Sequence, residues 1–312
     1  MTGNSEILIG NQRVRIHDEG HSAGYFHTYD HFQTSGAAYP ERIIRIFLPR
    51  DYESEDRRYP VLYMNDGNTA FTKGGIVNQT WDVANMLGHF YQDHATLKFI
   101  VVGLDPVKRN REYTHAVWSG PDWGGLESYS SCIADWVKPF IDAYYRTLPE
   151  RENTMILGSS HGGLAAFYIA CRRPDEFGFG SALSPSFWVG VDHAEDSPVV
   201  KPDDNASLSR SQLILMFHNT LADVKRRPKL YLDWGLARTG GPHNEFIEER
   251  ATVRGREMAL LLQTEYGYRL GEDLFVYEDP KGEHSEESWG KHMPRILQYF
   301  TMALLHEGLA RP

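Results

Sequence analysis

The chain has 312 residues, of which 41% are hydrophobic and 12% aromatic, so it is long enough to bury a large core. Its 42 Asp and Glu residues outnumber its 32 Lys and Arg residues, and the net charge of −10 argues against a nucleic-acid partner. The first residues, MTGNSEILIGNQRVRI, lack the regions of a secretion signal, and no run of about 18 apolar residues predicts a membrane span. We therefore expect a cytoplasmic protein that binds neither nucleic acid nor membrane.

Short apolar segments bounded by Pro, Gly or Asp recur along the chain and predict strands. The stretch to about residue 50 favours antiparallel strands, and the predicted strands cover residues 43–48, 61–65, 99–104, 154–158, 180–183, 229–234 and 274–278. Apolar residues at helical spacing lie between them, near residues 133–144, 247–261 and 293–304. Strands that alternate with helices predict an α/β fold, with a mostly parallel sheet covered on both faces.

The chain contains no repeat and no long linker, so we expect one domain over residues 1–312. Residues 1–50 supply its N-terminal strands, and about 189–228 form a lid-like or connecting insertion. The two cysteines, Cys132 and Cys171, lie inside helical patterns. This position predicts small buried side chains rather than a disulfide framework or a zinc site.

The segment TMILGSSHGGLAAFYIACRR has the pattern of a nucleophile elbow. Ser160 lies in Gly-x-Ser-x-Gly, between a predicted strand and a predicted helix, at the strand end where α/β sheets bind ligands. Gly158 and Gly162 permit the tight turn that exposes the hydroxyl. An ordinary helix-capping serine fits the local sequence too, but the strand, turn and helix together favour a nucleophile.

A serine hydroxyl needs a base, and in this kind of fold the base comes late in the chain, after the acid. In DLFVYEDPKGEHSEESW, His284 follows the last predicted strand and precedes the last helix. His292 lies inside that helix beside Lys291, which predicts a surface side chain. We therefore predict His284 as the base.

Several blocks of the sequence resemble the putative-esterase family of α/β-hydrolases, which includes enterochelin-type esterases, S-formylglutathione hydrolase, feruloyl esterases and mycolyltransferases. The blocks are RYPVLYMNDGNTAF, VVGLDPVKRNREY, KPFIDAYYRT, GSSHGGLAAFYIACRRPDEFGFGSALSPSFW and EDPKGEHSEESW. They spread from about residue 40 to the C-terminus. The resemblance implies an α/β-hydrolase fold and its catalytic apparatus, and says little about the substrate.

Two backbone N–H groups must bind the oxyanion of such a reaction. One belongs to the residue after the nucleophile, here His161. The other should follow the strand in VLYMNDG, and the resemblance to mycolyltransferases assigns it to Asn68. The alternative is that Asp66 and Gly67 form only a turn.

The acid is the least determined member of the triad. Many relatives place an acid about three positions past the Gly of KLYLDWG, where this chain has Arg238. The stretch GGPHNEFIEERA resembles the mycolyltransferase segment whose second Glu is the acid, which implies Glu248. Glu245, Glu249 and Asp233 are the other candidates, and a Ser-His dyad without an acid stays open.

Other residues allow both a functional and a structural interpretation. Arg109, Arg111 and Glu112 either ring the pocket or brace loops. Five tryptophans near strand and helix ends could line an acyl pocket or pack in the core: Trp81, Trp118, Trp123, Trp188 and Trp289. No spacing of His and Arg resembles a metal site, and we expect no cofactor.

The sequence thus predicts a serine carboxylic-ester hydrolase that acts on a small-molecule ester through Ser160, His284 and an acid. An acyltransferase would use the same residues, and a non-catalytic binding module on this fold is a further alternative. The acyl and alcohol groups of the substrate and the oligomeric state do not follow from the sequence.

Overall fold

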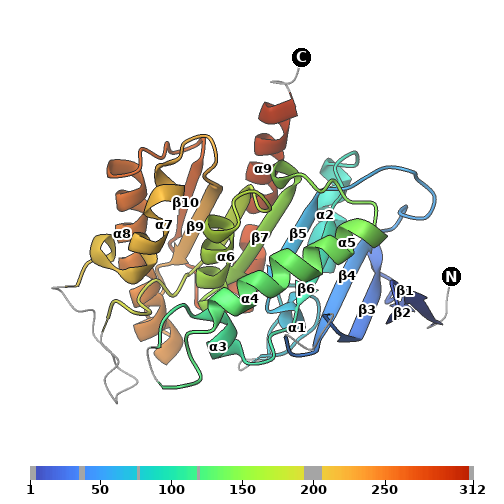
Figure 1. The fold of residues 1–312 in the computed structure, drawn as a ribbon, viewed down its shortest axis with the longest axis horizontal. Coiled ribbons are helices and arrows are strands. Elements are labelled where there is room, and N and C mark those ends of the chain that lie inside the picture. The colour runs from blue at the N-terminus through green and yellow to red at the C-terminus, as the bar shows by residue number, and fades with distance from the viewer. Residues whose placement is uncertain (1–4, 35–38, 76–77, 118–119, 193–205, 309–312) are drawn as a thin grey trace.

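The computed structural model describes residues 5–34, 39–75, 78–117, 120–192 and 206–308. Within them, strands pair into a ten-stranded sheet in the order β1-β2-β3-β4-β6-β5-β7-β8-β9-β10 (Figure 1). Neighbours from β1 to β4, and the pair of β4 with β6, are antiparallel, whereas β6, β5, β7, β8, β9 and β10 are mutually parallel. The predicted parallel sheet with antiparallel N-terminal strands is confirmed.

Each of the seven predicted strands is present, with ends that differ by at most one residue. The strand bounds are β1 Ser5–Ile9, β2 Gln12–His17, β3 Gly24–Phe32, β4 Arg42–Pro49, β5 Val61–Asn65, β6 Ile100–Leu104, β7 Thr154–Ser159, β8 Phe179–Leu183, β9 Lys229–Gly235 and β10 Leu274–Asp279. Every residue of β5 to β8 is buried. This explains their continuous apolar sequence, since a parallel sheet is covered on both faces.

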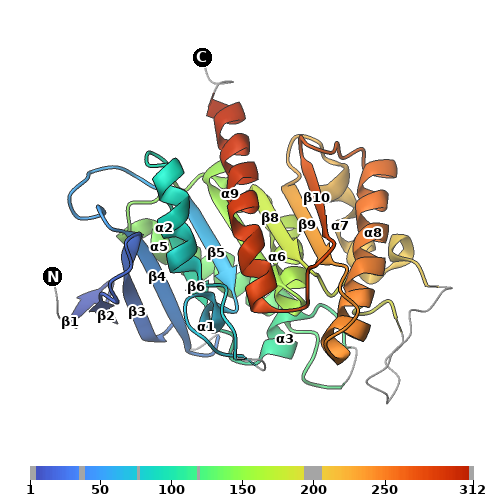
Figure 2. The same ribbon diagram turned by 180° about the vertical axis from the view of Figure 1, so that it is seen from behind.

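The helices lie in two layers, one on each face of the sheet. Their bounds are α1 Gly67–Ala70, α2 Val83–Asp93, α3 Arg109–Tyr113, α4 Leu126–Cys132, α5 Lys138–Tyr144, α6 His161–Arg172, α7 Gln212–Ala222, α8 Glu249–Thr264 and α9 Glu286–Gly308. Two π-helical turns, η2 Ile133–Val137 and η5 His243–Glu248, precede α5 and α8, and short 3₁₀ turns lie at η3 Arg151–Asn153 and η4 Leu208–Arg210. Figure 2 shows α2 and α9 crossing the face of the sheet opposite to α4, α5 and α6.

The two faces of the sheet carry separate apolar clusters. Along β5, Val61 and Tyr63 pack with the side chains of α4 to α8, while Leu62 and Met64 pack with those of α2 and α9. This division follows from the two-residue repeat of a strand, in which successive side chains point to opposite faces. Both cysteines are buried and unpaired, as predicted.

The segment after β8 was expected to be a lid-like or connecting insertion. Its described part contains η4 and α7, and α7 packs on α6, where the rings of Phe217 and Tyr168 lie 4.9 Å apart. This helix is the crossover that returns the chain from β8 to β9. Residues 193–205 lie outside the described residues.

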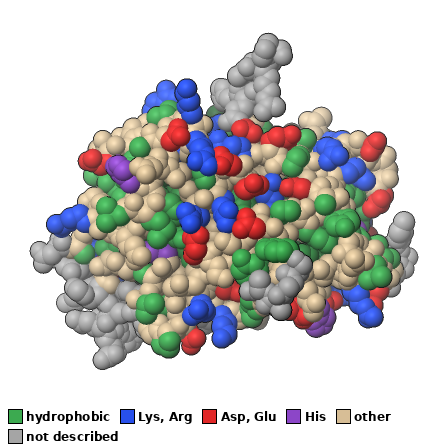
Figure 3. Space-filling view, viewed as in Figure 1, with side chains coloured by type: hydrophobic (Ala, Val, Ile, Leu, Met, Phe, Trp, Pro, Cys, Tyr) green, Lys and Arg blue, Asp and Glu red, His purple; other side chains and the backbone are tan. Residues whose placement is uncertain are grey.

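The surface carries charged side chains of both signs. On the face seen in Figure 3, Lys and Arg side chains are interspersed with Asp and Glu side chains. In the described part of the chain, none of the helices is long and apolar enough to cross a bilayer.

Candidate active site

Ser160 occupies a strained turn between β7 and α6. Its backbone has φ 55° and ψ −122°, a conformation that non-glycine residues adopt only where the surroundings enforce it. The Ser160 N–H donates to the carbonyl of Leu183, and its carbonyl accepts from the N–H groups of Gly163, Leu164 and Ser186. These bonds hold the turn, so the serine is fixed at the carboxyl end of a central strand.

The flanking glycines leave room for this turn. A Cβ at Gly158 would lie 2.4 Å from the carbonyl oxygen of Gly162, and a Cβ at Gly162 would lie 2.9 Å from the carboxylate of Asp66. Both distances are too short for a real side chain. The Gly-x-Ser-x-Gly pattern therefore reflects backbone packing around Ser160.

His284 lies in the loop between β10 and α9. Its backbone N–H donates to Asn244 Oδ1 at 2.8 Å, and its Nδ1 lies 2.5 Å from Glu248 Oε2. The ring of Trp289 meets the imidazole edge-on, with 4.9 Å between the centroids. A carboxylate at Nδ1 favours the tautomer that carries its proton there, which leaves the Nε2 lone pair available as a base.

Glu248 is fully buried, and both of its carboxylate oxygens have partners. Oε2 faces His284, while Oε1 accepts from the Ser184 hydroxyl at 2.8 Å and from the N–H of Gly235. Glu248 is the last residue of the π-helical turn η5, a kind of irregularity that recurs at functional sites. The acid candidate implied by the family resemblance is thus the carboxylate in contact with His284.

The other acid candidates lie elsewhere. Glu245 lies in η5 and Glu249 begins α8, and both residues are exposed. Asp233 is buried at the end of β9, where it accepts from the Tyr231 hydroxyl and pairs with His292 Nδ1, each at 2.8 Å.

The prediction that His292 is a surface residue is wrong, because only 6% of it is exposed. Its second ring nitrogen lies 3.0 Å from Asp279, so the imidazole bridges the ends of β9 and β10. Burial lowers the pKa of His292, but the hydrogen bonds and charges of Asp233 and Asp279 outweigh it and raise the pKa to about 9. Asp233 and Asp279 therefore hold a charged histidine in α9.

The two residues predicted to supply the oxyanion amides both lie in first helical turns. His161 begins α6, and Asn68 is the second residue of α1. The N–H groups of a first turn have no partner within their helix and are suited to bind an anion. The Asp66 backbone is left-handed, with φ 56°, and its N–H donates to the Tyr113 hydroxyl.

An ion pair fixes the start of α1. Arg109 Nε and Nη2 each bind one carboxylate oxygen of Asp66 at 2.8 Å. Of the two roles considered for Arg109, the structure shows both, because the residue lines the pocket and braces a loop. Glu112 pairs with the buried Arg42, and Arg111 donates to the Pro121 carbonyl.

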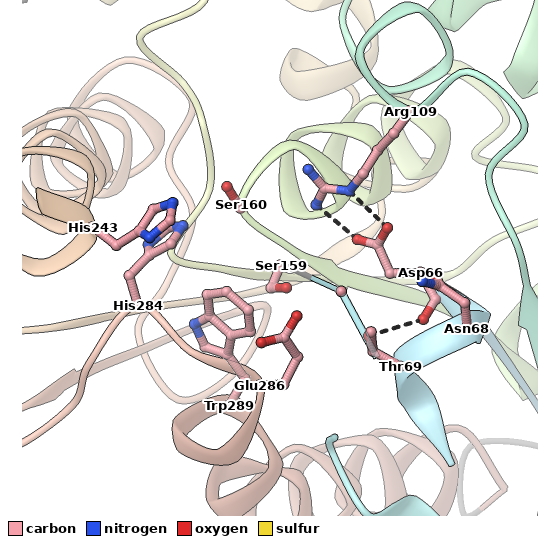
Figure 4. A pocket seen from close by; sticks show the side chains of 11 residues that line it. Asp66, Asn68, Thr69, Arg109, Ser159, Ser160, His243, His284, Glu286 and Trp289 are labelled. Atoms are coloured by element: carbon pink, nitrogen blue, oxygen red, sulfur yellow. Dashed lines mark hydrogen bonds and ion pairs between the residues drawn. The ribbon is translucent and has the colours of Figure 1, made fainter. Parts of the chain in front are cut away.

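Ser160 and His284 line one pocket of about 150 Å³. Figure 4 shows His243 and His284 on one side of Ser160, Arg109 and Asp66 on the other, and Glu286 and Trp289 rising from the start of α9. The ring of His243 lies parallel to that of His284, with 6.0 Å between centroids. The complete lining is Asp66, Asn68, Thr69, Gly75, Arg109, Ser159, Ser160, His243, His284, Glu286 and Trp289.

The side chain of His161 packs beside this pocket rather than lining it. Its Nδ1 lies 2.7 Å from the Ser186 hydroxyl, and the rings of Trp123 and Trp188 meet it edge-on at 5.2 and 5.3 Å. Burial lowers its pKa well below the ordinary value, so the imidazole is neutral. Trp118 lies outside the described residues.

Sequence reasoning missed three residues that shape the site: Ser184, Asn244 and Glu286. Ser184 and Asn244 act through hydrogen bonds across distant loops, which carry no local pattern. Glu286 could have been considered from its position two residues after His284. Among the described residues, no three His, Cys, Asp or Glu side chains gather in a way that could hold a metal ion.

The chain belongs to the family described as "Putative esterase", whose model matches residues 35–300. The uncharacterised protein YbbA of Bacillus subtilis is 26% identical over 155 residues, which cover 47% of this chain and 58% of that protein. An esterase of Mycobacterium tuberculosis is 27% identical over 156 residues, covering 50% of this chain and 31% of the relative. The matches thus span between about a third and three fifths of these relatives.

Solved structures share the fold. An IroE-like serine hydrolase from Shewanella oneidensis has a TM-score of 0.64 at 18% identity, over 88% of this chain and 79% of that one. A ferulic acid esterase from Anaeromyces mucronatus has a TM-score of 0.59 at 18% identity, over 90% and 92%. The enterobactin esterase of Shigella flexneri has a TM-score of 0.57 at 16% identity, over 87% and 57%. The architecture is the α/β-hydrolase fold.

Proposed function

We propose that this protein is a serine carboxylic-ester hydrolase, a single α/β-hydrolase domain that acts through Ser160, His284 and Glu248. One observation carries the proposal: the buried Glu248 carboxylate binds Nδ1 of His284, and His284 shares a pocket with the strained Ser160. Membership of the esterase family and the fold of named serine hydrolases support it.

In the first half of the reaction, Nε2 of His284 takes the Ser160 proton while the serine oxygen attacks the ester carbonyl carbon. The carbonyl oxygen becomes an oxyanion, which the backbone N–H groups of Asn68 and His161 stabilise. The bond to the alcohol then breaks, and the protonated His284 gives its proton to the leaving oxygen. Glu248 stabilises the imidazolium throughout, since its carboxylate stays at Nδ1.

The second half releases the acid. His284 takes a proton from water, whose oxygen attacks the acyl carbon of the Ser160 ester. The new tetrahedral intermediate collapses, the serine oxygen leaves with the proton held by His284, and a carboxylic acid departs. The enzyme returns to its starting protonation state.

An acyltransferase would differ only in the acceptor, an alcohol in place of water. Adding alcohols to a hydrolysis assay distinguishes the two, because a transferase forms a new ester in preference to the free acid. The names of the neighbours suggest which esters to try first, since the solved structures include ferulic acid esterases and an enterobactin esterase. A panel of p-nitrophenyl, feruloyl and catecholate trilactone esters tests these classes side by side.

Fluorophosphonate labelling separates an enzyme from a binding module. The wild type should react covalently and Ser160→Ala should not, while both keep the same thermal unfolding midpoint within a few degrees. His284→Ala should label far more slowly. A wild type that neither labels nor hydrolyses p-nitrophenyl acetate would refute the proposed function.

A further inference from the structure

The pocket contains a carboxylate that forms no ion pair with a side chain of the described chain. Glu286 is the first residue of α9, and Figure 4 shows its carboxylate pointing into the pocket beside Ser159. One of its oxygens would lie 3.1 Å from a Cβ built on Gly75, across the pocket wall. Within the described chain, no other residue's side chain forms a hydrogen bond or ion pair with it.

The guanidinium group in the pocket lining, that of Arg109, already has a hydrogen-bonded partner. The Nε and Nη2 atoms of Arg109 are both hydrogen-bonded to Asp66, so this guanidinium pairs directly with Asp66 and acts on Glu286 only through its charge, without a hydrogen bond. Carboxylates therefore outnumber guanidinium groups along the pocket lining. With His243 and His284 neutral, the side chains of the lining therefore carry one more negative than positive formal charge.

Burial raises the pKa of Glu286, a hydrogen bond from its own backbone N–H lowers it, the charge of Asp66 raises it, and Arg109 and His284 lower it, and the net direction is upward. A raised pKa means that the protein stabilises the ionised form of Glu286 less well than water does. A positive charge brought in by a ligand would supply the missing stabilisation.

We propose that Glu286 is a specificity-determining residue that selects esters carrying a positively charged group, such as a quaternary or primary ammonium, a few ångströms from the scissile carbonyl. The inference deepens the proposed function and rests on it. The same carboxylate disfavours substrates with a free carboxylate in that position, because like charges repel in a half-buried site.

A purely structural role predicts a different behaviour. A carboxylate in the first turn of a helix interacts favourably with the helix dipole, and Glu287 shares that turn. In that case replacing Glu286 changes the stability of the protein without changing its preference among substrates. Glu287 is exposed and therefore provides a matched control with the same loss of charge on the next residue.

The test compares esters that have the same shape and differ only in charge. Acetylcholine and 3,3-dimethylbutyl acetate place the cation or its neutral counterpart in the alcohol. The p-nitrophenyl esters of betaine and of 3,3-dimethylbutanoic acid place it in the acyl group. For each pair, the ratio of kcat/KM for the cationic ester to kcat/KM for the neutral one is measured in the wild type, Glu286→Gln and Glu287→Gln.

We expect the ratio for at least one pair to fall about tenfold in Glu286→Gln, the effect of one charge at short range in a partly solvated site, and to stay unchanged in Glu287→Gln. Equal ratios in the wild type and Glu286→Gln for both pairs overturn the inference, as does an equal fall in the two variants. A wild type that hydrolyses p-nitrophenyl acetate but neither cationic ester overturns it too, while leaving the proposed function intact. A wild-type protein that hydrolyses none of the esters and is not labelled by a fluorophosphonate refutes the proposed function itself.

Discussion

Replacing Glu248 with Gln tests the proposed triad, because the change keeps the shape of the side chain and removes its charge. The carboxylate has two different tasks: Oε2 accepts from His284 Nδ1, and Oε1 accepts from Ser184 and from the Gly235 N–H. A carboxylate can accept at both oxygens, whereas an amide has one acceptor and one donor end. Either orientation of the glutamine amide in Glu248→Gln therefore fails at one of the two tasks.

If the amide nitrogen faces His284, it forces the tautomer with the proton on Nε2, and the imidazole can no longer accept the proton of Ser160. If the amide is turned round, its nitrogen meets the Gly235 N–H, and a buried donor loses its acceptor at a cost of roughly 1–3 kcal/mol. In both orientations the negative charge that stabilises the imidazolium is gone. We expect kcat to fall by about 10³- to 10⁴-fold, equivalent to about 4 to 5.5 kcal/mol of transition-state stabilisation.

Hydrolysis of p-nitrophenyl acetate by purified protein measures the effect, with thermal unfolding as a check that the variant is folded. Glu245→Gln is the control, because Glu245 is exposed in the same helical turn and should keep activity within about twofold of the wild type. Activity of Glu248→Gln within tenfold of the wild type would show that this carboxylate does not act with His284. A larger loss in Glu245→Gln than in Glu248→Gln would show that the acid is misassigned.

Two further predictions concern stability. The positive φ of Ser160 stores strain of order 1–3 kcal/mol. Both Ser160→Gly and Ser160→Ala should be inactive, but Ser160→Gly should have a free energy of unfolding about 1 kcal/mol higher and a higher urea midpoint. Equal urea midpoints for the two variants contradict the strain. The pKa of His292 is raised to about 9, above its value of about 6.5 in an unfolded chain. The stabilisation by protonated His292 is therefore complete below about pH 6.5 and lost as the pH rises through 9. The difference in unfolding free energy between the wild type and His292→Gln should shrink by roughly 3 kcal/mol over that range. A difference that stays constant with pH refutes the charged bridge of Asp233, His292 and Asp279.

The sequence was informative where local patterns dictate structure. The strand before Ser160 and the glycines at 158 and 162 could be identified because strand composition and a tight turn each have a characteristic local sequence. The parallel sheet followed from the alternation of strands and helices, and each predicted strand end lies within one residue of the observed end.

The sequence was less informative where residues far apart in the chain meet. Apart from the family resemblance, the sequence around Asp233 and Glu248 does not show which carboxylate faces His284 and which faces His292, because the choice depends on how η5 and α9 pack against the ends of β9 and β10. His292 was predicted to be a surface residue because it lies in the last helix beside Lys291, whereas its partners Asp233 and Asp279 come from two strands distant in sequence. Glu286 stands in a helix start that resembles ordinary capping, and only the pocket shows where its carboxylate points.

The short loop after β8 forms hydrogen bonds to three other elements near the pocket: the turn η5, the helix α9 and the turn at Ser160. Ser184 holds Glu248 and also accepts from the Trp289 indole, while two residues later the Ser186 N–H binds the carbonyl of Ser160. Neither serine belongs to the walls that a substrate would touch. In the proposed enzyme, the hydrogen bonds of Ser184 and Ser186 that position Glu248 and Ser160 therefore lie behind the pocket lining, to which His243 and Glu286 belong. A substitution in the lining would thus alter which ligand fits without breaking the hydrogen bonds of Ser184 and Ser186.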